Sequence, residues 1–74
     1  MRIEAGWVVV DLPGVDPLVP VAIAVGEGPA QPAFRDTLAG RPVAKVPVLD
    51  IPRVGVRIYL ELDGSRTEVG RFTG

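Results

Sequence analysis

Aspartates and glutamates are the main acid–base groups of this chain, because its 74 residues include nine of them but no histidine and no cysteine. Asp11 and Asp50 stand in similar settings, before Leu-Pro and Ile-Pro. Two carboxylates in related positions can share acid–base work, whereas aspartates in turns hydrogen-bond nearby backbone N–H groups. A chain this short is too small to form a catalytic cleft unaided, so we interpret both as turn-forming residues.

Other catalytic and ligand-binding patterns are incomplete. Ser65 is the only serine and has no histidine to activate it. Asp11 and Asp16 offer too few oxygens for calcium, which takes six or more. Gly26 and Gly28 are not followed by the Gly-Lys-Ser/Thr of a phosphate-binding loop. The sequence therefore predicts a protein that is not an enzyme and has no catalytic, cofactor-binding or metal-binding residues.

The composition also excludes several kinds of partner. Eight cations and nine anions are scattered singly and leave a net charge of −1, so no basic patch for nucleic acid or a membrane surface is indicated. The apolar runs 7–10 and 18–25 are too short for a membrane helix, which needs about 20 residues, and the first is wrongly flanked for a signal peptide. We expect a protein that is cytoplasmic when synthesised and binds no nucleic acid or membrane.

Short β-branched segments bounded by proline and glycine predict an all-β fold with a single domain, 1–74. The expected architecture is a small antiparallel sandwich or partly open barrel with five strands, near 2–12, 18–25, 42–51, 54–63 and 65–72. One short helical turn near 33–39 could begin at Pro32 and carry Phe34 and Leu38 inward. A domain of this size buries only about 60% of its unfolded surface, so a partner would add stability.

The hairpin over 54–72 is the clearest element. Its first strand alternates apolar and polar residues, and Asp63-Gly64 suits a two-residue type I′ turn. That turn fixes the pairing of the two strands. The expected pairs are Leu62 with Ser65, Glu61 with Arg66, Leu60 with Thr67, Tyr59 with Glu68 and Ile58 with Val69.

The chain also echoes itself at a spacing of 39 residues. The motif Asp-(Leu/Ile)-Pro-x-Val occurs at 11–15 and at 50–54, and each copy is followed by a β-branched strand. A duplicated β-corner would produce this pattern, and so would chance in a chain rich in valine and proline.

Three expected strands carry apolar residues on both faces, over 7–12, 18–25 and 43–51. A small sandwich has one interior, so each strand should have one solvent-exposed face. Surplus apolar faces need a cover, and an uncovered patch of several hundred Å² marks an interaction surface. We therefore predict a protein interface that includes Trp7, Val46, Pro47, Val48, Leu49, Arg57 and Tyr59.

Three prolines, at 42, 47 and 52, bear on how the segment 42–51 pairs. If the strand spans 43–51, Pro42 and Pro52 end it and Pro47 removes one interior N–H donor. Proline guards an edge strand against further strand addition. We therefore expect an edge strand whose partner packs against side chains.

These features favour a structural or assembly protein that docks through apolar strand faces onto copies of itself or onto a larger assembly. A minor virion or capsid decoration protein of a phage, incorporated into the virion, is one version of this hypothesis. The alternative is a small monomeric binding or inhibitory module that presents the loop 26–36. In that case, shortening the loop should lower the affinity.

Overall fold

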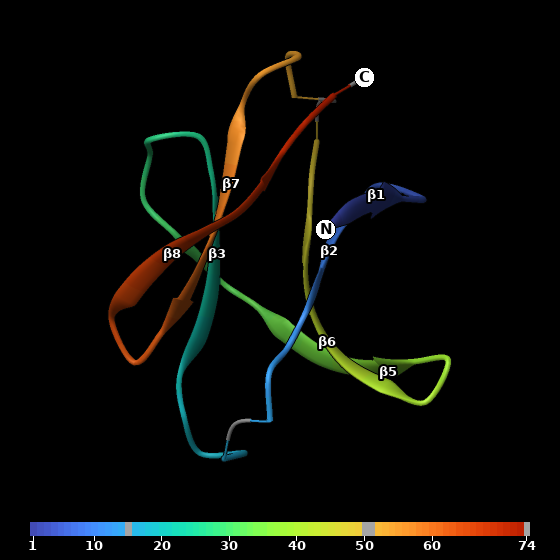
Figure 1. Ribbon diagram of the computed structural model, residues 1–74, viewed down its shortest axis with the longest axis vertical. Helices are drawn as coiled ribbons and strands as arrows, with labels where there is room; N and C mark the ends of the chain where they lie inside the picture. The colour runs from blue at the N-terminus through green and yellow to red at the C-terminus, as the bar shows by residue number, and fades with distance from the viewer. Residues whose placement is uncertain (15, 50–51, 74) are drawn as a thin grey trace.

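The computed structural model describes residues 1–14, 16–49 and 52–73, which contain strands and turns but no helix. Two antiparallel sheets of four strands each lie side by side in Figure 1: sheet A, in the order β1-β2-β6-β5, and sheet B, in the order β4-β3-β7-β8. The predicted all-β class is confirmed, with eight strands where five were expected. The strands are β1 (Arg2–Glu4), β2 (Trp7–Asp11), β3 (Val21–Val25), β4 (Gln31–Pro32), β5 (Phe34–Leu38), β6 (Arg41–Pro47), β7 (Arg57–Leu62) and β8 (Ser65–Arg71).

Two alanine-glycine turns account for most of the difference in strand number. Ala5 and Gly6 have φ values of 49° and 83°, and Ala39 and Gly40 have 51° and 77°. Two successive residues with positive φ make the tight turn that joins antiparallel strands. The first turn divides the expected strand 2–12 into β1 and β2, and the second joins β5 to β6.

The helical turn expected near 33–39 is therefore wrong. Residues 34–38 form β5, which pairs with β6 from Phe34 opposite Lys45 to Leu38 opposite Arg41. Phe34 and Leu38 consequently do not point inward, and their exposed fractions are 59% and 37%. Tertiary strand pairing overrides the weak local helix signal here.

The β7–β8 hairpin has the expected turn, with φ of 51° at Asp63 and 84° at Gly64. Its register is confirmed for four of the five pairs, from Leu62 with Ser65 to Tyr59 with Glu68. The fifth pair is wrong, because an irregularity between Ile58 and Tyr59 places Ile58 opposite Gly70. A β-bulge of this kind adds one residue to one strand and bends it.

The prolines of β6 do not mark a sheet edge. β6 lies between β2 and β5, so the expected edge strand is wrong. The Pro42 carbonyl accepts from Leu12 and the Val48 N–H donates to Gly6, so the even-numbered residues of β6 bond toward β2. The missing donor of Pro47 thus faces the β5 side, where the β5–β6 register ends at Lys45. Proline is tolerated there because no ladder hydrogen bond is lost.

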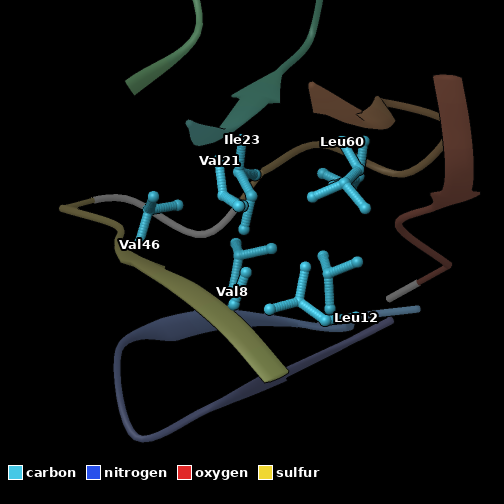
Figure 2. Packing of buried hydrophobic residues seen from close by; sticks show 9 residues of the cluster. Val8, Leu12, Val21, Ile23, Val46 and Leu60 are labelled. Carbon is cyan, nitrogen blue, oxygen red and sulfur yellow. The ribbon is translucent and has the colours of Figure 1, made fainter. Parts of the chain in front are cut away.

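The hydrophobic core lies between the two sheets. Side chains at alternate positions of β2, β3, β6 and β7 meet there, as Figure 2 shows for six labelled residues. This alternation follows from the two-residue period of a strand, which gives each strand one inward face. The buried cluster consists of Val8, Val10, Leu12, Val21, Ile23, Ala44, Val46, Ile58 and Leu60.

The two halves of the chain share one topology. A hairpin, β1–β2 or β5–β6, is followed by two strands of sheet B, and the inner pairs β2–β6 and β3–β7 each join one strand from each half. A pseudo-twofold axis perpendicular to both sheets would relate β1–β4 to β5–β8 and would produce this strand order. The Ala5 and Ala39 turns lie 34 residues apart rather than 39, and the repeated motif falls partly outside the described residues, at Val15, Asp50 and Ile51.

Candidate functional site

The outer face of sheet A, which points away from the core, carries a continuous row of apolar side chains. Val8 and Val10 of β2 and Ala44 and Val46 of β6 belong to the core, so the residues that alternate with them point outward. Directly opposite residues share a face, which adds alternate residues of β5. We call the outer-face patch the set Trp7, Val9, Phe34, Asp36, Leu38, Val43, Lys45 and Pro47.

Aromatic and charged side chains contact one another at the centre of this patch. The rings of Trp7 and Phe34 meet edge to face with centroids 5.9 Å apart, an arrangement that aromatic pairs prefer. Lys45 places Nζ 4.7 Å from the centre of the Trp7 ring and 2.9 Å from Asp36 Oδ2. The Trp7 ring therefore spans from β2 over β6 to β5.

Asp36 is held ionised. The Lys45 side chain, which donates to its carboxylate, and the Thr37 N–H, which donates to Oδ1 at 2.7 Å, hold the pKa of Asp36 below its ordinary value of 3.8. A carboxylate already occupied by two donors is poorly suited to act as a general acid. Its role in this geometry is to position Lys45.

A shallow pocket of about 190 Å³ lies on this face. Val9 and Val43 form part of its lining and are almost fully covered, with 7% and 2% exposed. This volume is below the 300 to 1,000 Å³ typical of small-molecule sites. Its lining consists of Glu4, Ala5, Trp7, Val9, Asp36, Leu38, Val43 and Lys45.

A second, larger hollow of about 430 Å³ lies at the end of β3 and β6 and is lined by Val25, Gln31, Pro47, Val48 and Leu49. Among the described residues of this lining, Gln31 is the only polar side chain. These described residues offer mainly apolar contact.

The structure separates the residues predicted to form one interface. Trp7 and Pro47 are register partners on the outer face of sheet A. Val46 is fully buried in the core and offers no side-chain surface to a partner. Val48 is half-buried against the core, while Leu49, beyond β6, is fully exposed.

Arg57 and Tyr59 lie on the other sheet, on the outer face of β7. The Tyr59 hydroxyl donates to Glu27 Oε1 at 2.9 Å, and the guanidinium of Arg66 lies 5.3 Å from the Tyr59 ring. Tyr59, and then Glu68, raise the pKa of Arg57 above its ordinary value. The charged side chains of this face are paired with one another. The face is therefore less favourable for docking another protein.

Sequence reasoning missed most of the outer-face patch. The helical turn expected near 33–39 includes Phe34 and Leu38, and the predicted interface does not include Lys45. The signal was present in the alternation of Phe34, Asp36 and Leu38 before an Ala-Gly pair, the pattern of a strand entering a tight turn. The same pair follows Glu4 in the first hairpin.

The fold and this face define the chain as a small all-β protein of two four-stranded antiparallel sheets. Comparison with known protein families, curated proteins and solved structures finds no match. Within the described residues, no cluster of three or more acidic side chains is arranged to hold a metal ion. The same part of the chain has no helix long and apolar enough to cross a membrane.

Proposed function

We propose that this protein is a non-enzymatic assembly subunit that binds another protein chain through the outer-face patch. The observation that carries the proposal is the Trp7, Phe34 and Lys45 cluster, which orders large side chains on a face that the protein's own core does not use. Tryptophan and other aromatic residues in partly covered pockets are the usual centres of protein interfaces.

The geometry gives less support to a monomer that presents the loop 26–36. Much of this segment is strand, in β4 and β5. Glu27 accepts from the Tyr59 hydroxyl, and the Gly28 carbonyl accepts from Arg66 Nη2 at 3.3 Å. A phage virion or capsid decoration subunit remains one version of the assembly proposal, and only the small size and the two-faced strands support it.

Affinity purification from a native lysate tests the proposed function, with the tagged wild type compared with two variants. Phe34→Arg places a charge in the outer-face patch, and Leu18→Arg places the same charge at a residue that is 91% exposed elsewhere. We expect Phe34→Arg to lose the bound protein and Leu18→Arg to keep it. If both variants retain the same bound proteins as the wild type, the outer-face patch is not the docking surface.

A further inference from the structure

We propose that the occupant of the outer-face patch is a second copy of this chain, docked face to face across a twofold axis parallel to β2 and β6. This inference rests on the proposed function and names its partner. Two sheets that stack in aligned fashion keep their strands within about 30° and lie about 10 Å apart. In such a dimer, each position on the outer face of sheet A meets the position at the opposite side of the same row in the second copy, and the aromatic rows of this face are compatible with that pairing.

The cross-strand register defines four rows on this face, two of which carry the aromatic side chains. One row runs across all four strands as Arg2, Val9, Lys45 and Phe34. The neighbouring row runs as Glu4, Trp7 and Pro47. β1 and β5 are the edges of the sheet, as the two hairpins in Figure 1 show.

A twofold axis parallel to the strands reverses the order of each row in the facing copy. Arg2 of one copy then lies over Phe34 of the other. Val9 and Lys45 occupy facing positions but contribute little contact, because Val9 is only 7% exposed. In the neighbouring row, Trp7 lies over Pro47. Guanidinium over an aromatic ring and indole against proline are both favourable contacts, so these two rows complement their own reversed copies. The row Asp11, Val43 and Asp36 does not, because it places Asp11 over Val43.

The charges of the face also fit a second copy. Three cations and three anions occupy its outward positions, so the face does not select a strongly acidic or strongly basic partner. Phe34 neighbours Asp36 on β5, so the facing Arg2 approaches a carboxylate as well as a ring. The six charged residues are Arg2, Arg41, Lys45, Glu4, Asp11 and Asp36.

The area of the face is sufficient for a weak dimer. Four strands about 4.8 Å apart and about 17 Å long give a face of roughly 300 Å² in projection. Two such faces, with the relief of their side chains, bury on the order of 1,000 Å², which is the lower bound for a specific interface.

The edges of sheet A favour pairing by the face over pairing by strand addition. The outward N–H of Thr37 on β5 is already bonded to Asp36 Oδ1 at 2.7 Å. β1, at the other edge, has only three residues. A capped donor and a short strand are both devices that discourage strand addition.

Analytical ultracentrifugation across a range of concentrations tests the dimer, with four proteins compared. The wild type should reach twice its monomer mass of 7.8 kDa. Phe34→Arg opposes Arg2 of the other copy and should weaken dimerisation at least tenfold, while Phe34→Glu, which loses the same ring, should weaken it less. Leu18→Arg should dimerise like the wild type.

Chemical crosslinking gives a second measurement that does not depend on these charges. The chain has no cysteine, so Arg2→Cys and Phe34→Cys each provide one reactive thiol. A short bis-maleimide should link a mixture of the two variants efficiently. Either variant alone should link poorly, because residue 2 of each copy lies at opposite edges, about 14 Å apart laterally.

The outcomes separate this inference from the proposed function. A wild type that stays monomeric, a dimer that Phe34→Arg does not weaken, or equal crosslinking of Arg2→Cys alone and of the mixture would each overturn the second-copy assignment. If the wild type is monomeric but captures another protein in a Phe34-dependent way, the proposed function stands and only the identity of the partner is wrong.

Discussion

Lys45 holds its Nζ atom 4.7 Å from the centre of the Trp7 ring while it donates to Asp36. This relationship joins three strands, because Trp7 is on β2, Lys45 on β6 and Asp36 on β5. A cation over an indole ring adds about 0.5 to 1 kcal/mol at an exposed site. The same cation also connects the Trp7 ring on β2 to Asp36 on β5.

The Asp36 carboxylate should make stability depend on pH. Its pKa is lower in the folded chain than its ordinary value of 3.8, chiefly because Lys45 donates to it. The unfolded chain therefore binds the proton first as the pH falls, and the stabilisation is present above 3.8 and lost below it as the pH falls through the folded pKa. Urea unfolding of wild type and Asp36→Asn should differ at neutral pH and converge as the pH falls below the folded pKa of Asp36.

The control for this experiment is Asp63→Asn, which removes a carboxylate in the β7–β8 turn, away from Lys45. If the two variants lose stability with the same pH dependence, the pairing of Asp36 with Lys45 is not its cause.

The two alanine-glycine turns should be improvable. Ala5 and Ala39 adopt φ values of 49° and 51°, which alanine tolerates poorly and asparagine well. Ala39→Asn creates the preferred Asn-Gly turn and should raise the free energy of unfolding by about 0.5 to 1 kcal/mol. Ala5→Asn should give a similar gain, because both turns have the same conformation. A loss of stability in either variant, measured by urea unfolding, would contradict the strained-turn explanation.

Val46 and Leu49 should respond in opposite ways to truncation. Val46 is 0% exposed in the core, whereas Leu49 is 102% exposed. Val46→Ala removes two buried methyl groups and leaves a cavity, so it should cost about 2 kcal/mol. Leu49→Ala should change the stability by less than about 0.5 kcal/mol. Equal losses in denaturant unfolding would mean that the Leu49 side chain is not exposed.

Arg35 should govern the order of the segment before β3. Its Nη2 donates to the carbonyls of Asp16 and Val19 at 3.1 and 2.6 Å. Arg35→Gln should speed hydrogen exchange at the Leu18 and Val19 amides, which both donate to Asp16, and lower stability by about 1 kcal/mol. Unchanged exchange at these amides would show that Arg35 does not hold the segment.

Elements governed by local chemistry could be predicted from the sequence. Asp63-Gly64 set the β7–β8 turn and four cross-strand pairs, because a two-residue turn with positive φ permits only one register of the two strands that it joins. The failure at Ile58 arose from the bulge, which depends on packing: a Cβ on Gly70 would lie 3.3 Å from Met1 Cε. Met1 reaches that position only through the β1–β2 hairpin, which the pattern of residues 2–12 did not separate.

Some residues of the outer-face patch could likewise be predicted from the sequence, and others could not. Trp7 and Pro47 were predicted from their apolar character, and they are partners on one face. Phe34, Asp36 and Lys45 join them only because β5 pairs with β6 in a particular register. The Ala39-Gly40 turn sets that register locally, whereas no local signal reports that β2 lies beside β6.

The sequence by itself determined the all-β class, the tight turn at Asp63-Gly64 and the two-faced strands, because backbone conformation and side-chain alternation are local properties. The tertiary structure alone decided that β6 is an inner strand, that Val46 faces the core, and that Trp7, Lys45 and Asp36 meet on one surface. Those outcomes depend on contacts between residues far apart in the sequence, such as Trp7 with Pro47, 40 positions away. Contacts of that separation are fixed when the two sheets pack around a common core, which no single segment encodes.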